Sequence, residues 1–401
     1  MVQRNLYMEQ IIPLINNDLI KVITGIRRCG KSYMLNLLKE ELINRGVKEY
    51  NIILINFDST KYNNIQNNRE LDKIVKKLIK NKKDKVYLFF DEIQNVKKWE
   101  QSIVGYKIDY DCDIYITGSN SNLLSGELST HLTGRYMEIK MYPFSYQEFL
   151  DYKQEESNSK LFDEYIQYGG MPQIFQIDKN QKIKYLEDLF NSIIYKDIIK
   201  RYPIKDIDIL ERLTTFIFDN VGQIFSASSI MKFYKEEMNI KISNKTISNY
   251  LKYLENACLI KKVKREDLEG KNILKFNEKY YISDHGFCEI KTKGNFANIG
   301  RIIENIVYFE FLRRGWEITI GKTNDFEIDF VCKKHNSIIY VQVAYVLETE
   351  NIINREFRPL LKINDNYPKY VISMDQFDRS FDGIKHLKLI DFLLNPNLID
   401  I

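Results

Sequence analysis

The residues with the clearest chemical meaning form a glycine-rich segment near the amino end. Residues 25–32 read GIRRCGKS and match the phosphate-binding pattern G-x-x-x-x-G-K-[ST] at every fixed position. In such a loop, backbone N–H groups and the amino end of the following helix surround a polyphosphate. Lys31 is expected to reach the β- and γ-phosphates, and the Ser32 hydroxyl is expected to hold Mg²⁺. The alternative is a plain glycine turn between a strand and a helix.

The flanking residues favour the phosphate-binding interpretation. An apolar run at 20–24 precedes the loop, and apolar residues at helical spacing follow it over 33–42. The predicted nucleotide-binding residues are Gly25, Ile26, Arg27, Arg28, Cys29, Gly30, Lys31, Ser32 and Tyr33. Within this set, Arg27 and Arg28 occupy variable positions of the pattern, and we expect them to face outward.

An acidic pair supplies the second half of the predicted site. The unbroken apolar run at 86–90 is typical of a buried parallel strand, and it ends in Asp91-Glu92. The carboxyl end of such a strand borders the ligand crevice of an open α/β sheet. We expect Asp91 to hold Mg²⁺ from outside its first coordination sphere and Glu92 to polarise the water that attacks the γ-phosphate. The alternative is a solvated acidic pair at a strand end.

The elements around these motifs predict a doubly wound parallel sheet. Strands are expected at 20–24, 51–57, 86–90, 113–117 and 137–141, and helices at 32–44, 70–81, 98–107 and 144–152. In ATPases with a phosphate loop and an acidic strand of this kind, a further strand inserted between the two ends in a polar residue. Here that strand is 113–117, and Asn120 is predicted to hold the attacking water opposite Glu92. Capping of the following helix is the alternative role for this polar tip.

Several short motifs together resemble one family. They are the phosphate loop and the acidic pair described above, with Ile116–Asn120, Leu132–Arg135, Pro143–Phe149 and Gly169–Pro172. The chain resembles, over essentially its whole length, the prokaryotic AAA+-like P-loop ATPases that have a C-terminal domain of unknown function. The resemblance implies that the C-terminal half is a winged helix followed by a restriction-endonuclease-like domain.

Two of these motifs have alternative interpretations. Arg135 resembles the family's Gly-Arg motif, and such an arginine stabilises γ-phosphate charge either in cis or from a neighbouring subunit. Its alternative is an exposed side chain that pairs with Glu138. The stretch Gly169–Pro172 is expected to turn the chain into a helical lid close to the adenine, and a simple helix-breaking turn explains its composition equally well.

The predicted domain organisation has four parts. They are a P-loop ATPase domain at 1–155, a helical lid and connector at 156–205, a winged helix at 206–290, and a restriction-endonuclease-like α/β domain at 291–401. The third helix of the winged helix, at 245–257, has polar and basic side chains suited to phosphate and base edges. DNA is therefore a candidate partner, although winged helices also serve as protein docking modules.

The final domain departs from the family's catalytic pattern. Restriction-endonuclease-like folds use a helix glutamate, a strand aspartate and a downstream [Glu/Gln]-x-Lys, and here Glu304, Asp329 and Gln342 match while Ala344 stands at the lysine position. A methyl group cannot orient a water or offset phosphate charge. We therefore predict a nuclease-like fold without nuclease activity. Two alternatives are a lysine supplied from elsewhere, such as 333–334, and an ordinary α+β domain with surface acids.

Composition agrees with a large intracellular enzyme. A chain of 401 residues is long enough for two or three domains, and Lys+Arg 59 against Asp+Glu 55 gives a net charge of only +4. A net charge this small does not by itself indicate a nucleic-acid-binding protein. The five cysteines lack metal-ligand spacing, which predicts no zinc site and a reducing, cytoplasmic compartment. No apolar run is long enough to span a membrane.

Together these features predict an Mg²⁺-dependent ATPase with ATP as substrate. Hydrolysis is expected to switch the winged-helix and nuclease-like half of the chain, acting in a homo-oligomer or on a protein client. One alternative is an ATP-gated DNA-binding regulator or defence component. A second alternative is an ATP-dependent nuclease.

Overall fold

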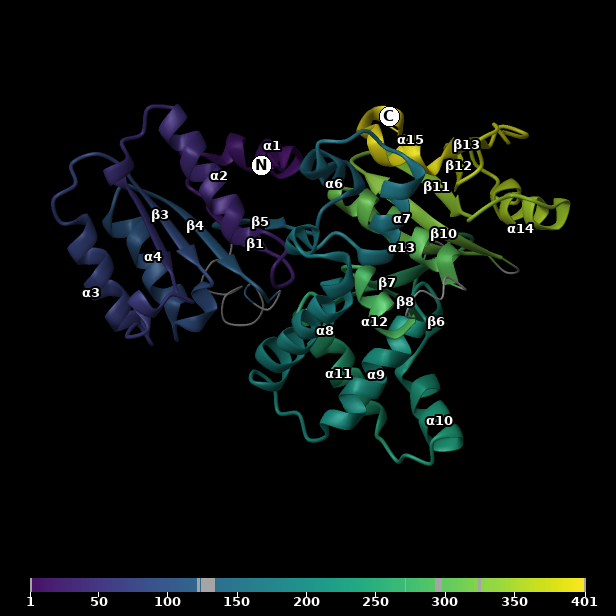
Figure 1. Cartoon of the computed structure of the whole chain (residues 1–401), viewed down its shortest axis with the longest axis horizontal. Coiled ribbons are helices and arrows are strands. Elements are labelled where there is room, and N and C mark those ends of the chain that lie inside the picture. Colours follow the sequence, from purple (N-terminus) through teal and green to yellow (C-terminus); the bar gives the residue numbers. More distant parts are fainter. Residues whose placement is uncertain are drawn as a thin grey trace. The chain divides into compact units, whose positions relative to one another are not determined.

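The computed structural model describes residues 2–120, 123, 134–270, 272–292, 298–323 and 326–399, with the side chains of 272–277 and 291–292 left out. The chain forms two compact units (Figure 1). The first comprises Met1–Pro143 with Asn256–Cys258, and the second comprises Phe144–Glu255 with Leu259–Ile401. The helix that the sequence predicts at 144–152 therefore lies in the second unit, although the predicted ATPase domain extends to residue 155.

The first unit is built on a five-stranded parallel sheet. Its strands are β1 (Ile20–Thr24), β2 (Ile52–Asn56), β3 (Val86–Asp91), β4 (Cys112–Gly118) and β5 (Tyr136–Lys140). They lie in the order β2-β3-β4-β1-β5, so β4 is inserted between the acidic strand and the phosphate-loop strand as predicted. Every residue of β1, β3 and β4 is buried, which explains the unbroken apolar run of β3. The two buried charges of the other strands, Lys21 of β1 and Asp113 of β4, form an ion pair at 2.5 Å.

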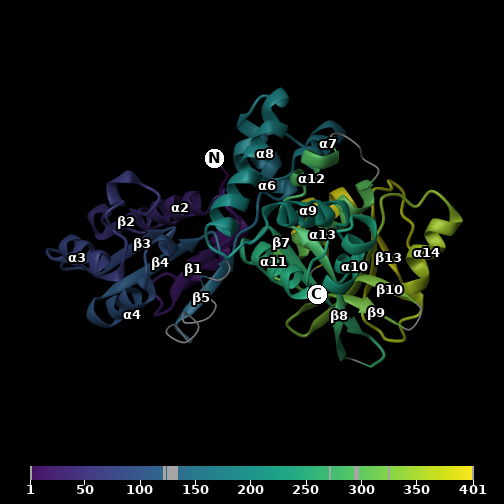
Figure 2. The same ribbon diagram turned by 90° about the horizontal axis from the view of Figure 1, so that it is seen from below.

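Helices cover this sheet on both faces. They are α1 (Asn5–Ile11), α2 (Lys31–Asn44), α3 (Asn68–Ile79) and α4 (Trp99–Asp109). In Figure 2, α2 lies on one side of β3 and β4, and α4 lies on the other. The connection from β1 to β2 crosses the sheet in one direction, and the connections from β2 to β3 and β4 return in the other. Because each crossover is right-handed, the helices of the two directions lie on opposite faces. The sheet therefore presents the carboxyl ends of β1, β3 and β4 along one edge.

The second unit contains most of the helices of the chain. Those before its main sheet are α6 (Tyr146–Lys153), α7 (Ser159–Tyr168), α8 (Lys182–Ile193), α9 (Ile207–Asp219), α10 (Ala227–Glu237) and α11 (Asn244–Asn256). Those after the first hairpin are α12 (Gly286–Thr292), α13 (Ile299–Arg313), α14 (Glu350–Leu361) and α15 (Leu389–Leu394). Within the predicted lid and connector at 156–205, α8 is continued by a π-helical turn, Ile194–Ile199.

One eight-stranded sheet runs through the second unit in the order β13-β12-β11-β10-β9-β7-β8-β6. Its strands are β6 (Ile224–Phe225), β7 (Ile260–Asp267), β8 (Asn272–Ile282), β9 (Glu317–Lys322), β10 (Glu327–Lys334), β11 (Ser337–Val343), β12 (Lys369–Ser373) and β13 (Lys385–Lys388). The β7–β8 hairpin joins the later strands because residues 265–267 of β7 pair in parallel with 320–322 of β9. The strands at 206–290 and those at 291–401 thus share one sheet.

The glycine turn after α7 packs inside the second unit. Gly169 has φ 75°, and a Cβ there would collide with the carboxylate of Asp284. That carboxylate accepts hydrogen bonds from the backbone N–H groups of Gly170 and Gly286, both at 2.9 Å. Burial raises the pKa of Asp284 to about 7. Glycine is therefore needed here for close approach to Asp284, which accounts for the motif without a nucleotide.

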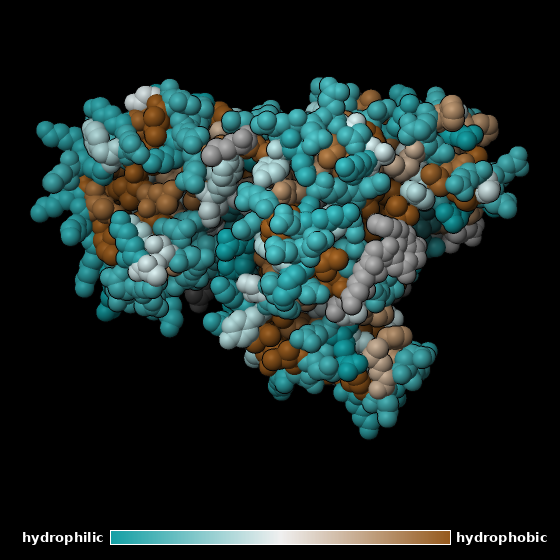
Figure 3. Space-filling model, viewed as in Figure 1, coloured by the Kyte–Doolittle hydropathy of each residue, from teal (hydrophilic) through white to brown (hydrophobic). Residues whose placement is uncertain are grey.

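The face of the molecule seen in Figure 3 is mostly hydrophilic, with scattered apolar patches. Exposed large apolar side chains, such as Tyr50, Ile108 and Phe377, are spread along the chain. No described helix has the length and apolarity that crossing a membrane requires. All five cysteines are free thiols.

Candidate functional site

The phosphate loop connects β1 to α2 with a backbone that only glycine permits at two points. Gly30 has φ 108° at the N-cap of α2, in the left-handed region. A Cβ on Gly25 would collide with the carbonyl oxygen of Met141, at the end of β5. Cys29 is buried, and its carbonyl oxygen accepts a hydrogen bond from Arg4 at 3.4 Å. The two fixed glycines of the motif are thus explained by local geometry.

The Lys31 side chain lies inside this loop. Its Nζ donates to the carbonyl oxygens of Gly25 at 3.0 Å and Ile26 at 3.1 Å. The same Nζ lies 3.7 Å from Glu92 Oε1. Burial opposes the ammonium, but its anionic neighbours outweigh burial and raise the pKa of Lys31. A charged lysine is therefore available to an anion at the mouth of the loop.

Asp91, at the end of β3, forms hydrogen bonds on both carboxylate oxygens. Thr117 Oγ1 donates to Oδ1 at 2.5 Å, and Asn56 Nδ2 donates to Oδ2 at 2.8 Å. The Ser32 hydroxyl also bonds to this carboxylate. Burial raises the pKa of Asp91, against these hydrogen bonds. The hydroxyl of Ser32 beside a carboxylate is a donor set that fits Mg²⁺, and both predicted metal residues lie together.

Glu92 is held in an unusual backbone conformation by its neighbours. Its φ is 57°, and its N–H donates to Thr117 Oγ1 at 2.9 Å. The carboxylate Oε2 accepts from Ser119 Oγ at 3.1 Å and from Gln94 Nε2. Burial opposes ionisation, but Lys31 and Arg27 outweigh burial and lower the pKa of Glu92. An ionised carboxylate in this position is suited to accept a proton from water.

Four of these contacts come from residues that were not among the predicted site residues, although two of the four lie in the Ile116–Asn120 motif. They are Asn56, Gln94, Thr117 and Ser119. Asn56 and Thr117 are polar residues at the carboxyl ends of strands that neighbour β3, which is a signal that was present in the sequence. Ser119, the residue before the predicted Asn120, reaches Glu92 with its hydroxyl. Asn120 is buried beside it, and its carbonyl oxygen accepts from Leu123 N–H at 3.1 Å.

The two loop arginines differ in exposure. Arg28 is exposed, with φ 69°. Arg27 is half-buried, and its Nη1 lies 3.9 Å from Asp58 Oδ2. Arg28 is thus exposed, whereas the charge of Arg27 is near enough to Glu92 to lower the pKa of that carboxyl.

Arg135 lies at the amino ends of β1 and β5, whereas the phosphate loop follows the carboxyl end of β1. Its carbonyl oxygen accepts from Ile20 N–H at 2.8 Å, and Tyr136 pairs with Ile20 at the amino end of β1. The phosphate loop follows the carboxyl end of β1, about 16 Å further along at ~3.3 Å per residue. Arg135 is therefore too distant to contact a nucleotide in the loop of its own chain. Glu138, its alternative partner, instead accepts from Thr24 Oγ1 at 2.7 Å.

The predicted nuclease-like residues also come together, in the second unit. Asp329 N–H donates to Gln342 Oε1 at 3.2 Å, which sets β10 beside β11. Lys279 Nζ lies 3.1 Å from Glu304 Oε1 and 3.6 Å from Asp329 Oδ1. Ala344 instead belongs to an apolar cluster with Leu347, Phe357 and Leu360. The lysine near the acids thus comes from β8, and neither Lys333 nor Lys334 fills that role.

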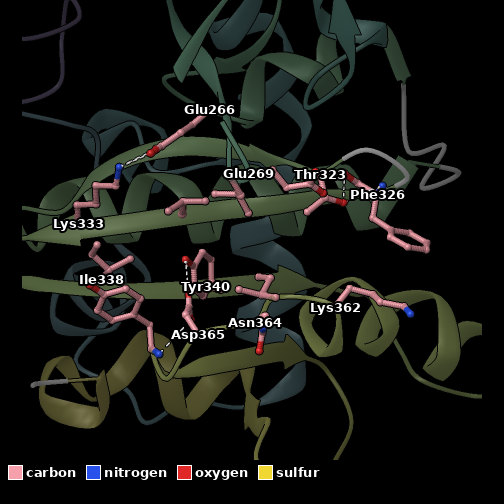
Figure 4. Close-up of a pocket in the computed structure, with 14 residues that line it drawn as sticks. Glu266, Glu269, Thr323, Phe326, Lys333, Ile338, Tyr340, Lys362, Asn364 and Asp365 are labelled. Atoms are coloured by element: carbon pink, nitrogen blue, oxygen red, sulfur yellow. Dashed lines mark hydrogen bonds and ion pairs between the residues drawn. The ribbon is translucent and has the colours of Figure 1, made fainter. Parts of the chain in front are cut away.

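A separate cavity of about 760 Å³ lies elsewhere on the second unit's sheet (Figure 4). Its lining includes Lys333, which contacts both carboxylate oxygens of Glu266 at 2.7 Å. Tyr340 Oη donates to Asp365 Oδ2 at 2.7 Å in the same cavity. These charged groups form pairs with one another, so the lining presents no convergent set of groups for a particular ligand.

Comparison with known proteins agrees with the geometry of the first unit. Residues 17–150 match the family model of an AAA domain, and residues 159–294 match a domain of unknown function. The first span contains the whole phosphate loop together with Asp91 and Glu92. With the parallel sheet and its inserted strand, this match makes the first unit an AAA+ P-loop ATPase domain.

A relative from Haemophilus influenzae is 40% identical over 399 residues, which cover 98% of this chain and 99% of the relative. The chain belongs to this protein's family. A protein from Methanocaldococcus jannaschii, MJ1544, is a further member, 33% identical over 86% of this chain and 81% of its own length. Both relatives are named only as uncharacterized proteins. The family therefore joins the AAA domain to the second unit in both bacteria and archaea.

Solved structures with partial similarity include Orc1 of Aeropyrum pernix in complex with DNA, at 9% identity and a TM-score of 0.31 over 73% of this chain and 92% of that one. AMPPCP-bound DnaA of Aquifex aeolicus has 12% identity and a TM-score of 0.34 over 63% and 88%. The RuvB branch migration motor of Thermotoga maritima has 15% identity and a TM-score of 0.33 over 65% and 87%.

Proposed function

We propose that the protein is an Mg²⁺-dependent ATPase whose nucleotide cycle switches the conformation of the second unit. The observation that carries this proposal is the convergence of three groups at one edge of the sheet. They are the Lys31 ammonium, the Ser32–Asp91 pair and the Glu92 carboxylate. A site that only binds nucleotide would not need Glu92 ionised and held by two side-chain donors.

In the proposed reaction, the loop N–H groups and Lys31 bind the β- and γ-phosphates of ATP. Glu92 accepts a proton as the water oxygen attacks the γ-phosphorus, and the bond to the β-phosphate oxygen breaks to release ADP. Ser119 and Gln94 orient the carboxylate that takes this proton. Mg²⁺, which Ser32 and Asp91 would hold, supplies charge neutralisation at the phosphates.

Two variants test this assignment. Lys31→Ala should lose tight ATP binding, because the cation facing the phosphates is removed. Glu92→Gln should keep ATP binding and lose roughly 10²- to 10⁴-fold in turnover, because only proton transfer is affected. ATP binding is measured by calorimetry and turnover by phosphate release, with Glu40→Gln on the exposed face of α2 as the control. Parental turnover in Glu92→Gln would overturn the assigned base.

Arg135 is proposed to act in trans on the site of a neighbouring subunit. An exposed arginine about 16 Å from its own phosphate loop suits such a role better than one in cis. Arg135→Ala should then bind ATP normally, hydrolyse it poorly, and recover activity when mixed with Lys31→Ala, because mixed assemblies contain intact composite sites. Parental turnover of Arg135→Ala alone would leave only a surface role.

The second unit is proposed to contain a winged helix and a restriction-endonuclease-like fold. Helices α9, α10 and α11 followed by the β7–β8 hairpin support the first, and α13 beside β10 and β11 supports the second. How the nucleotide state reaches this unit is tested by hydrogen exchange with ATP bound to Glu92→Gln. Slowed exchange confined to the first unit would contradict the proposed switching.

An ATP-gated DNA-binding regulator is the second candidate function. A groove of about 470 Å³ supports it, because hydroxyl, amide and lysine side chains from the starts of α10 and α11 and from the hairpin line that groove. Its lining includes Ser228, Asn244, Ser248, Lys252 and Lys262, together with the carboxylates of Glu255 and Glu278. If this groove binds the phosphate backbone, Lys252→Glu should weaken DNA binding in a salt-dependent manner without changing basal ATP turnover. Unchanged gel retardation in Lys252→Glu would remove this candidate.

A further inference from the structure

The second unit buries one lysine against three carboxylates. Lys279, on β8, has a side chain only 5% exposed. Its Nζ lies 3.0 Å from Glu327 Oε1, 3.1 Å from Glu304 Oε1 and 3.6 Å from Asp329 Oδ1. Glu304 belongs to α13, and the other two acids belong to β10. An ammonium with three carboxylate partners from two further elements is the centre of this cluster.

The continuous sheet explains how a lysine from the hairpin reaches these acids. Asn305 clamps α13 to the end of β8, because its side chain accepts from Ile282 N–H at 2.8 Å and donates to Ile282 O at 2.9 Å. This clamp sets Glu304 next to Lys279. Gly222 leaves room on the other side, where a Cβ would lie 3.1 Å from both Glu304 carboxylate oxygens. The cluster is thus assembled by elements far apart in the sequence.

Other groups satisfy part of the remaining acceptor capacity of the three acids. Tyr281 Oη donates to Glu304 Oε1 at 2.6 Å, and Val343 N–H donates to Asp329 Oδ2 at 2.9 Å. Arg265 Nη2 lies 3.5 Å from Glu327 Oε2. Buried carboxylates are stable only when they are paired and hydrogen-bonded in this way. The positive charge that offsets these carboxylates therefore comes from the side chains of Lys279 and Arg265.

A divalent metal does not fit this arrangement. A restriction-endonuclease-like site would use Glu304 and Asp329 as metal ligands, and the metal would occupy the space that both face. In the structure the Lys279 ammonium occupies that space. Across the part of the chain that the structure describes, no group of three or more His, Cys, Asp or Glu side chains is arranged to hold a metal ion. The lysine position of the usual pattern, Ala344, lies in apolar packing.

We propose that Lys279 is a built-in cation that takes the place of the divalent metal in a restriction-endonuclease-like site. The second unit then folds and acts without metal, and it does not cleave phosphodiester bonds. This inference rests on the proposed fold of residues 291–401 and is independent of the ATPase proposal, since neither Lys31 nor Glu92 takes part in it.

The test exchanges the lysine for a metal. In Lys279→Met the ammonium is lost and three carboxylates face one another, so the unfolding temperature in EDTA should fall by roughly 10 °C. Excess Mn²⁺ should restore most of this loss, because the acids now form a metal site. The wild type should show neither a metal-dependent shift nor Mn²⁺-dependent cleavage of linear or supercoiled DNA.

Three controls keep the outcome decisive. Lys279→Arg retains the positive charge and should fold without metal. Lys262→Met removes a lysine from a partly exposed pair with Glu278 on the same β7–β8 hairpin, and should show no Mn²⁺ response. If Lys279→Met does not fold at all, adding Glu304→Gln and Glu327→Gln should restore folding that is indifferent to Mn²⁺.

Two results would overturn the proposal. One is Mn²⁺-dependent DNA cleavage by the wild type that disappears in Asp329→Asn, which would make the cluster a working nuclease site with Lys279 as its cation. The other is a Lys279→Met protein that Mn²⁺ does not stabilise, or a triple variant that Mn²⁺ does stabilise. Loss of ATP turnover in Lys31→Ala has no bearing on either result.

Discussion

The two units each bury a lysine against carboxylates, and the two lysines have different surroundings. Lys31 is held by two loop carbonyl oxygens and lies 3.7 Å from a single carboxylate, that of Glu92. Lys279 has three carboxylates at 3.0–3.6 Å, and its backbone is part of a strand. Both side chains are 5% exposed or less.

This difference separates an open site from a closed one. A phosphate can replace the loop carbonyls around Lys31, because they are neutral acceptors on a glycine-rich turn, and Glu92 keeps Ser119 and Gln94 as donors when that happens. An anion that approached Lys279 would have to displace three fixed carboxylates. Whether a buried lysine can bind an incoming anion therefore depends on how many carboxylates already surround its ammonium group.

The largest expected effect is on stability. Lys279→Met should destabilise the second unit by about 3–5 kcal/mol, because it leaves buried charge uncompensated. Lys31→Met should cost the first unit roughly 1 kcal/mol, because the one carboxylate it leaves retains its hydrogen bonds. Hydrogen exchange in EDTA, resolved by peptide, reports the two units separately. Equal losses in the two units would contradict the distinction between the lysines.

A smaller effect is expected on catalysis. Gln94→Ala should lower ATP turnover about tenfold and leave the KM for ATP unchanged, because Gln94 orients Glu92 without touching the phosphates. Ser119→Ala should have a similar but weaker effect. The matched control is Asn95→Ala, since Asn95 bonds instead to Asp58. A rise in KM for Gln94→Ala would assign this residue to binding.

The smallest expected effect concerns pH. Burial and the charge of Glu304 raise the pKa of Asp329 to about 8. Between about pH 4 and pH 8 the folded state then holds a proton that the unfolded chain has lost, so this group's contribution to stability falls as pH rises. The stability of the wild type relative to Asp329→Asn should therefore decrease as pH rises through that window, as measured by urea unfolding. A stability difference that does not change with pH would show that Asp329 is ionised throughout.

Most of the first unit's architecture was predictable because its signals are local. The runs at 20–24, 86–90 and 113–117 are buried parallel strands as expected, and the inserted strand lies between the other two. Arg135 was harder to interpret, because its position directly before the strand predicted at 137–141 does not reveal which residues of β1 lie beside it. The pairing of Tyr136 with Ile20 answers this through strand register, which is a property of the folded sheet.

The second unit was less predictable because its decisive contacts are long-range. The sequence favours two separate domains at 206–290 and 291–401, whereas three residues of β7 pair with β9 and unite their strands into one sheet. That pairing has no local signature, because any two strands of suitable pattern can pair. The absence of lysine at position 344 predicted an altered site, but it could not reveal that the Lys279 ammonium lies among the acids.

The sequence by itself determined the phosphate loop, the acidic pair and the parallel sheet that carries them. These depend on residue types at short, fixed spacing, where backbone conformation and hydrophobic periodicity act locally. Only the tertiary structure decided that Ser119 and Gln94 hold Glu92, that Arg135 lies far from its own loop, and that Lys279 occupies the centre of the acidic cluster. Each of these depends on strand order, register or helix docking, where residues distant in sequence come within hydrogen-bonding range and burial makes their charges act on one another.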